Sequence, residues 1–229
     1  MAWFIANLGS ILGNAGLHLY QALLPLVLGL IIAIPLAQLA RVSNIARGII
    51  LSLGSLLYTI PSLALFVVLP VVLGTQILDQ TNVIVALTIY AVALLVRTTV
   101  DALNSVDNDV RQAAVALGYK AVPRFFAVDL PLSVPVLFAG LRVVSVSNIA
   151  LVSVGAVIGV KNLGYYFTDG LQRDFLVEIL VGIIGTLVLA VLMDVILVLL
   201  QRLLTPWLRS VAGPEKAIPA AEPETAVVH

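Results

Sequence analysis

Three ionisable residues lie inside otherwise apolar stretches of the sequence, where a charge needs a partner. Asp194 lies in the stretch 175–204, six residues before Leu200, and six residues correspond to about 9 Å at roughly 1.5 Å per residue. Arg142 and Arg97 lie at similar depths in two other apolar stretches. Because an isolated carboxylate in such surroundings is costly or stays protonated, we expect an ion pair between Asp194 and Arg142 or Arg97. A static packing contact is its simplest role; a part in a conformational change and a bridge to another subunit are alternatives.

The residue types that most enzymes and metal sites need are scarce. Cysteine is absent and histidine occurs only at His18 and His229, which excludes disulfides and thiol chemistry and argues against a histidine-based metal cluster. A nucleotide-binding P-loop needs the pattern G-x4-G-K-[ST], and no Gly-Lys pair occurs. We therefore expect no catalytic residue, no metal and no cofactor, and we expect any ATP to be hydrolysed by a separate subunit.

The composition indicates what kind of scaffold carries these residues. The 229 residues are 61 % apolar and 10 % charged, and the mean hydropathy is +1.14. Soluble domains are nearer half apolar and one quarter charged, so this chain lacks the polar residues to coat a soluble globule. Lys plus Arg and Asp plus Glu balance at 12 each, which leaves no basic face for nucleic acid. The sequence therefore predicts a multi-pass membrane protein and argues against a water-soluble enzyme.

Five stretches are long and apolar enough to cross a bilayer as helices, since about 20 such residues span the hydrocarbon core. They are 17–40, 49–73, 83–103, 134–157 and 175–204. Ten of the twelve Lys and Arg residues fall on one side of this arrangement, and basic residues concentrate on the cytoplasmic side of membrane proteins. We expect an all-α, polytopic membrane protein with five transmembrane helices, the N-terminus outside and the C-terminus cytoplasmic.

These spans divide the chain into three parts. Residues 1–16 carry no charged side chain and are predicted to form a short external N-terminal segment. Residues 17–207 form the predicted transmembrane domain, whose long cytoplasmic loop covers 104–133. Residues 208–229 are mostly Pro, Ala and Glu with little to bury, and we expect a disordered cytoplasmic tail.

The loop 104–133 has the features of an ordered element. Asn108 or Asp109 is predicted to cap a short helix over 110–117, and Gly118 is predicted to end it in the left-handed conformation. A second short amphipathic piece follows, and we expect prolines 131 and 135 to end it before the next span. From these features alone, an interfacial helix pair on the bilayer and a docking surface for a cytoplasmic partner are equally good interpretations.

The sequence of this loop favours the docking surface for a cytoplasmic partner. Its residues Gln112, Ala113, Ala114, Gly118, Val128, Leu130 and Pro131 keep the spacing E-A-A-x3-G-x9-I-x-L-P. The loop thus resembles the EAA motif of binding-protein-dependent ABC importer permeases, with Gln112 replacing Glu and Val128 replacing Ile. In that family the loop contains a coupling helix that sits in a cleft of the cytoplasmic ATPase subunit, so the resemblance implies an ATPase-coupling role for these seven residues.

The resemblance extends beyond the loop: residues 18–207 are similar to the quaternary-amine uptake permeases. The matching segments are 18–20, 34–36, 40–41, 58–65, 96–99, 140–142 and 163–171. It implies a type I ABC importer permease fold in the cytoplasmic membrane of a prokaryote and a quaternary amine or related osmoprotectant as substrate: glycine betaine, choline, carnitine or proline. It also implies an external substrate-binding protein and a second permease subunit, identical or related. Lys161 and Asn162 depart from the family pattern, which has a glycine pair there.

Pro61 lies near the middle of the second predicted span, where a proline breaks a helical hydrogen bond and kinks the helix. We name Tyr58, Thr59, Pro61, Ser62 and Asn148 as candidate pathway or gate residues, with a static kink as an equally good interpretation.

Aromatic faces bind quaternary cations, but the tyrosines at 165 and 166 are expected to be interfacial anchors. Selectivity is therefore expected to reside in the binding protein.

Three other functions remain open. The EAA motif alone does not exclude a permease for another small solute, such as methionine or another amino acid. A secondary transporter would show inverted repeats or ionisable residues at the membrane centre, and the sequence shows neither. In a non-transporting membrane scaffold, the EAA spacing would be a coincidence.

Overall fold

The computed structural model describes residues 2–208, and all regular secondary structure in this part of the chain is helical, with no strand. The predicted tail lies outside the described residues from residue 209 onward. The elements in chain order are α1 (Ala2–Val42), α2 (Asn44–Thr59), α3 (Ser62–Leu73), α4 (Gln80–Asn104), α5 (Asn108–Ala116), α6 (Ala121–Arg124), a π-helical turn η1 (Phe125–Asp129), α7 (Leu130–Val152), a 3-10 turn η2 (Ser153–Ile158), α8 (Tyr165–Gln172) and α9 (Leu176–Leu204).

Within residues 2–208, four helical runs are long and apolar enough to cross a membrane: α1, α4, the run Ala121–Ile158 that contains α7, and α9. The pair α2 and α3 also passes this test, but its two halves are bent by 102°, so it is either a broken span or a re-entrant loop. The all-helical, multi-span prediction is therefore confirmed, with four or five candidate spans.

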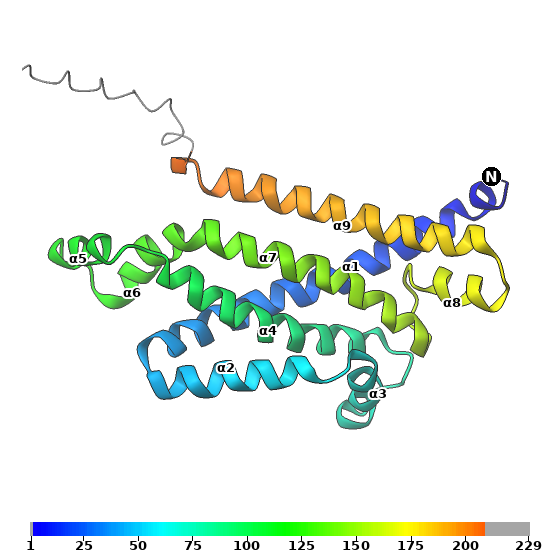
Figure 1. Ribbon diagram of the computed structural model, residues 1–229, viewed down its shortest axis with the longest axis horizontal. Helices are drawn as coiled ribbons and strands as arrows, with labels where there is room; N and C mark the ends of the chain where they lie inside the picture. The colour runs from blue at the N-terminus through cyan, green and yellow to red at the C-terminus, as the bar shows by residue number, and fades with distance from the viewer. Residues whose placement is uncertain (1, 209–229) are drawn as a thin grey trace, which may run out of the picture.

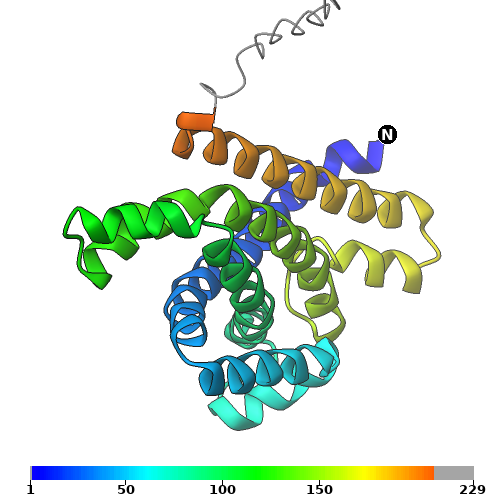
Figure 2. The ribbon, with the colours of Figure 1, turned by 60° about the vertical axis from the view of Figure 1, so that its left-hand side comes forward.

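Helix α4 is the centre of the bundle. It packs against α1, α2 and α7, and α9 lies against α7 on the opposite side of the bundle from α2 (Figures 1 and 2). Small residues allow the close approaches. A Cβ added to Gly29 of α1 would lie 2.6 Å from the Ala91 Cβ, and one added to Gly140 of α7 would lie 2.7 Å from Thr98. These contacts set the positions of the spans relative to α4.

Helix α1 contains 41 residues, which corresponds to about 60 Å at 1.5 Å per residue. A hydrocarbon core of about 30 Å takes only half of that length. The predicted external segment is thus the first four turns of α1, continuous with the span. Trp3 in its first turn makes edge-to-face contacts with Tyr166 and Phe175, at centroid distances of 6.3 and 5.5 Å.

The structure corrects the expected kink at Pro61. Helix α2 ends at Thr59 and Pro61 is the N-cap of α3, so the chain makes a complete break instead of a kink within one helix. A proline disfavours helical backbone in the residue before it, and Ile60 is accordingly extended, with ψ 128°. The Tyr90 hydroxyl of α4 donates a hydrogen bond to the Ile60 carbonyl, which satisfies one of the acceptors that the break leaves free.

Two details of the loop after α4 also differ from the predictions. The N-cap of α5 is Asp107, one residue before the predicted positions, and its carboxylate accepts a hydrogen bond from the Asp109 N–H at 2.9 Å. Pro131 and Pro135 do not end the helix, because the chain stays helical from α6 through η1 into α7. Pro131 lies at the start of α7, which directly follows the π-helical turn η1.

Candidate functional site

The segment predicted to couple to an ATPase projects from one end of the bundle, beyond the ends of α4 and α7 (Figure 1). Helix α5 carries the first half of the motif: Ala114 is buried, and Gln112 and Ala113 are exposed. Four large apolar side chains around this turn are also exposed, which is unusual for a loop in water. They are Val115, Leu117, Val122 and Phe126, and each residue is 53 to 79 % exposed. We call these four the loop patch.

Gly118 forms the turn between α5 and α6 in a left-handed conformation, with φ +88°, as the sequence predicts. The Tyr119 N–H donates to the Ala114 carbonyl at 3.1 Å and the Gly118 N–H donates to the Val115 carbonyl at 2.9 Å. This pair of bonds is a Schellman motif, which closes a helix C-terminus on a residue that adopts positive φ without strain. No atom lies within 4 Å of a Cβ placed on Gly118, so the requirement for glycine here is conformational and not steric.

The second half of the motif anchors this segment to the bundle. Leu130 packs against a cluster of buried side chains from α1, α4 and η1, and Val128 and Pro131 are half-buried beside it. Phe125 belongs to the same cluster, together with Ala37, Ala40, Val100 and Leu103. The first half of the motif is therefore largely exposed on α5, and its second half packs against the buried side chains of the bundle.

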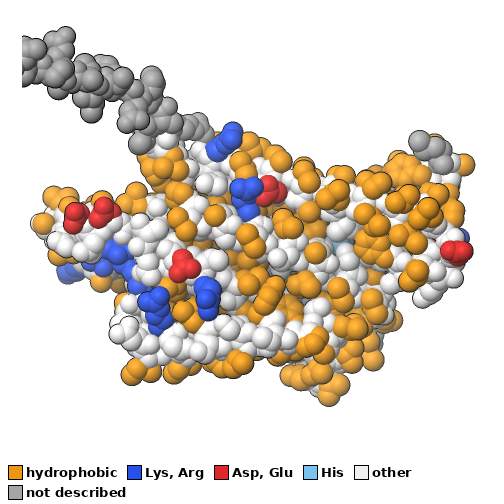
Figure 3. Space-filling model, viewed as in Figure 1, with side chains coloured by type: hydrophobic (Ala, Val, Ile, Leu, Met, Phe, Trp, Pro, Cys, Tyr) orange, Lys and Arg blue, Asp and Glu red, His pale blue; other side chains and the backbone are white. Residues whose placement is uncertain are grey.

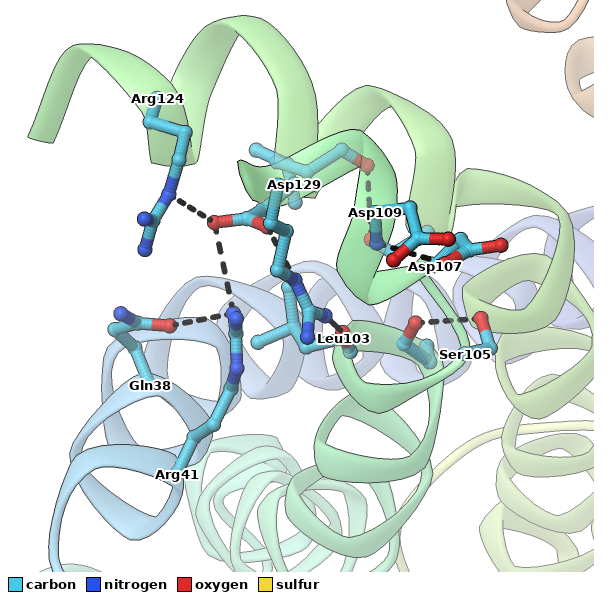
Figure 4. A network of polar contacts seen from close by, with 12 residues as sticks. Gln38, Arg41, Leu103, Ser105, Asp107, Asp109, Arg124 and Asp129 are labelled. Atoms are coloured by element: carbon cyan, nitrogen blue, oxygen red, sulfur yellow. Dashed lines mark hydrogen bonds and ion pairs between the residues drawn. The ribbon is translucent and has the colours of Figure 1, made fainter. Parts of the chain in front are cut away.

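Asp129 is a buried carboxylate that the sequence analysis did not single out. Its side chain is 1 % exposed and lies 2.9 Å from Arg111 of α5, 3.4 Å from Arg124 of α6 and 3.7 Å from Arg41 of α1 (Figure 4). Arg111 also donates to the Leu103 carbonyl of α4. Asp129 and Arg111 together thus join the projecting segment to two spans, α1 and α4.

A sequence signal for this cluster existed, because Asp129 is an acidic residue flanked by the apolar motif residues Val128 and Leu130. Its three arginines are spread over 84 positions of the chain, from Arg41 to Arg124. Three guanidinium groups around one carboxylate leave an excess of positive charge at this end of the molecule. Figure 3 shows charged side chains gathered near α5 and α6 and a mostly apolar surface along the bundle.

Asp194 of α9 pairs with Arg142 of α7. The contact is bidentate, with the Arg142 Nε 2.6 Å and Nη2 2.8 Å from the two carboxylate oxygens. Arg97, the other partner offered by the sequence, instead approaches the Ser55 hydroxyl of α2 at 3.5 Å. The Arg142 and Asp194 side chains are 41 and 32 % exposed, so the pair lies at the surface of the bundle and not within it.

Four of the five candidate pathway residues lie at the break between α2 and α3. Tyr58 meets Tyr90 edge to face at 5.7 Å, and the Thr59 hydroxyl donates to the Leu56 carbonyl at 2.7 Å. Pro61 and Ser62 begin α3. Asn148 is separate from this group: it is buried in α7, and its Nδ2 donates to the Ala22 carbonyl of α1 at 3.3 Å. The structure therefore makes Asn148 a contact between two packed spans.

Residues 2–208 contain no cluster of three or more His, Cys, Asp or Glu side chains that could hold a metal ion. What the described residues do offer is an exposed apolar patch on a projecting loop, tied to the spans by a buried ionic cluster. This arrangement can bind another protein and pass its movement to the spans.

Comparison with known proteins agrees with this geometry. Residues 26–210 match the family described as "Binding-protein-dependent transport system inner membrane component". The glycine betaine/carnitine/choline transport system permease protein OpuCB of Bacillus subtilis is 28 % identical over 206 residues, which cover 90 % of this chain and 94 % of that protein. The osmoprotectant import permease protein OsmW of Salmonella typhimurium is 31 % identical over 207 residues, covering 89 % of this chain and 96 % of that one.

The fold also has a solved counterpart. A chain of the inward-facing MetNI methionine ABC transporter superposes with a TM-score of 0.78 at 18 % identity, covering 87 % of this chain and 98 % of that chain. This likeness shows the ABC importer permease fold. Together with the family match over most of the chain, it establishes that this protein belongs to the binding-protein-dependent transport system inner membrane component family, as a transport subunit.

Proposed function

We propose that this chain is the membrane permease subunit of a binding-protein-dependent ABC importer for a quaternary amine or related osmoprotectant. Glycine betaine, choline, carnitine and proline are the candidate substrates. The relatives supply the substrate class, since glycine betaine, carnitine and choline appear in the name of one and osmoprotectants in the name of another. The ATP is hydrolysed by a separate cytoplasmic subunit, and an external binding protein delivers the substrate.

The observation that carries this proposal is the loop patch and its attachment. The patch offers an apolar surface of the kind that protein interfaces bury, and Gly118 sets the direction in which α6 leaves α5. Asp129 then ties α5, α6 and α1 together through three arginines. Closure of an ATPase dimer against the patch would therefore move α1 and α7 as rigid bodies, which alternating access requires.

The same charges support an orientation. Arg41, Arg111 and Arg124 lie at the α5–α6 end, and Lys161 and Arg173 lie in the segments around α8 at the opposite end (Figure 1). By the positive-inside rule, the α5–α6 end is cytoplasmic. With the α2–α3 pair counted as one span, five spans place the N-terminus outside and the C-terminus in the cytoplasm. Five spans rarely enclose a pathway alone, so a second permease subunit, identical or related, completes the channel in the cytoplasmic membrane.

Reconstitution tests the proposal directly. The permease would be placed in liposomes with its ATPase and binding protein, and uptake of labelled glycine betaine, choline, carnitine, proline and methionine would be measured with and without ATP. We expect ATP-dependent uptake of at least one quaternary amine, and its loss when Leu117→Asp places a charge in the loop patch. Uptake of methionine alone would contradict the substrate class, and uptake driven by an ion gradient without ATP would contradict the mechanism.

A further inference from the structure

An open cavity of about 730 Å³ lies at the end of the molecule opposite the loop patch. It is lined by residues from the N-terminal turns of α1, the loop before α8, α8 itself and the start of α9. Figure 1 shows that these elements meet at this end of the bundle. This volume falls within the roughly 300–1,000 Å³ typical of small-molecule sites. Neither the coupling segment nor the α2–α3 break contributes to it.

One wall of the cavity is aromatic. Trp3 and Tyr166 stand edge to face at a centroid distance of 6.3 Å and an angle of 88°, and Tyr165 meets Tyr166 at 5.6 Å and 76°. The Asn14 amide of α1 donates to the Tyr166 hydroxyl at 3.2 Å, which fixes that ring. Tyr166 is only 3 % exposed, so it faces the protein and is not the interfacial anchor that the sequence predicts. Aromatic faces of this kind bind quaternary ammonium groups, which have no N–H to donate.

Two carboxylates lie beside this wall. Arg173 is 2.9 Å from Asp169 and 3.5 Å from Glu178, and the Glu178 side chain is 2 % exposed. The hydrogen bond from Arg173 lowers the pKa of Asp169 below its ordinary value, so this carboxylate is ionised at neutral pH. One guanidinium serves both carboxylates, which places acidic oxygen atoms beside the aromatic rings. Glu178 is buried beside Asp169, so Asp169 has the lower pKa and is the more strongly acidic of the two.

A basic group without an ionic partner completes the lining. Lys161 borders the cavity and makes no ion pair with any residue in 2–208. The Gln21 amide of α1 donates to the Lys161 carbonyl at 3.1 Å, which holds its backbone against the helix. The ammonium group is therefore available to a carboxylate from outside the protein.

The sequence of α1 explains why the cavity is polar on that side. Asn7, Ser10 and Asn14 recur at intervals of three and four residues and line the cavity together, as residues on one helical face do. The exposed side chains Ile5 and Leu12 occupy other positions of the same turns. The polar residues of this part of α1 therefore face the cavity, and apolar residues occupy other faces of the helix.

We propose that this cavity is a substrate-binding site of the permease itself, for a zwitterion that carries a quaternary ammonium and a carboxylate, such as glycine betaine. The ammonium lies against Trp3 and the exposed ring of Tyr165 on the acidic side, and the carboxylate pairs with Lys161. The choice of glycine betaine rests on the proposed function, and the recognition chemistry rests on the cavity. In the proposed orientation, the site opens on the external face, where a delivered substrate arrives.

The test measures binding to the full-length permease in nanodiscs, without ATPase or binding protein. Trp3 and Trp207 are the only tryptophans, so in the Trp207→Phe variant the fluorescence of Trp3 reports on the cavity. We expect glycine betaine to change this fluorescence saturably and glycine, which lacks the methyl groups, to leave it unchanged. Equilibrium dialysis of labelled glycine betaine provides a second measurement that does not depend on tryptophan.

Substitutions separate the two halves of the site. A lost hydrogen bond to a charged group costs enough to weaken binding roughly ten- to a hundredfold. Lys161→Met should weaken glycine betaine to that extent and leave choline, which has no carboxylate, within about twofold. Trp3→Leu should weaken both ligands, whereas the matched change Phe4→Leu on the adjacent, exposed position should weaken neither. Because Lys161 holds no ion pair within residues 2–208, its replacement removes no internal ionic contact.

The outcomes distinguish this inference from the proposed function. Absence of saturable binding, equal binding of glycine, or equal losses for glycine betaine and choline in Lys161→Met would overturn the cavity site, even when the assembled importer transports glycine betaine. Failure of the assembled importer to take up any quaternary amine would refute the proposed function. Binding to the isolated permease is scored independently of that result.

Discussion

Replacing Gly118 tests the coupling turn most directly. Its φ of +88° is a conformation that costs an L-residue with a side chain about 1–2 kcal/mol. Since no atom lies within 4 Å of an added Cβ, this conformational cost is the whole direct effect. It corresponds to a roughly five- to thirtyfold shift in the population of the native turn. We expect the order Asn, Ala, Val from mildest to most severe, because Asn tolerates positive φ and a β-branched residue does not.

The assay is co-purification of the ATPase subunit with the permease, together with ATP-dependent uptake. Gly118→Val should leave the permease in the membrane but release or uncouple the ATPase, because α6 leaves α5 in the wrong direction. Gly48→Val is the matched control, since Gly48 of α2 is also exposed with open space around its Cα but has ordinary helical φ. Full uptake and normal ATPase binding in Gly118→Val would show that this turn does not position the docking surface.

Three further substitutions test the rest of the site. Asp129→Asn should weaken the attachment of α5 and α6 by about 3 kcal/mol, the scale of breaking a buried ion pair, measured as lower thermal stability and ATPase binding than in Asp109→Asn. Pro61→Ala should reduce uptake more than membrane insertion, because it lets the α2–α3 break straighten. Asp194→Asn should weaken assembly or uptake, and exchange of the charges at Asp194 and Arg142 should restore part of the loss.

Each of these expectations has a result that contradicts it. Equal stability and ATPase binding in the two Asp→Asn variants would remove Asp129 from the coupling segment. Uptake rates unchanged by Pro61→Ala over several substrate concentrations would leave the break as a static feature of packing. Normal assembly and transport in Asp194→Leu would mean that the surface pair contributes nothing measurable, as many exposed ion pairs do.

Local features of the coupling segment could be predicted closely from the sequence. Gly118 takes the left-handed conformation expected of it, because the end of a short helix is decided by a few neighbouring residues and by the freedom of glycine. The N-cap is Asp107 and not the predicted Asn108 or Asp109, and the sequence does not separate them because all three are good capping residues. Composition likewise sufficed for the multi-span helical fold, because apolar length alone decides whether a helix can cross a bilayer.

The geometry of the break at Pro61 could not be predicted from the neighbouring residues alone. A proline predicts that a helix is interrupted, but the angle depends on what the two halves pack against. Here Tyr90, thirty residues away on α4, bonds the Ile60 carbonyl, and the two halves lie at 102°. The same holds for Asp194, for which the sequence offered two arginines at similar depth. The packing of α7 against α9 selected Arg142.

By itself the sequence determined the helical, membrane-spanning character of this protein, the spacing of the EAA-like motif and the turn at Gly118, because these follow from composition and from residues close together in the chain. Only the tertiary structure decided the Asp129 cluster and the cavity between α1, α8 and α9. The cluster joins Arg41 to residues near 111 and 124, and the cavity joins the first turns of α1 to residues 161–178. Ion pairs and aromatic walls depend on distances between side chains, and those distances exist only after the helices have packed.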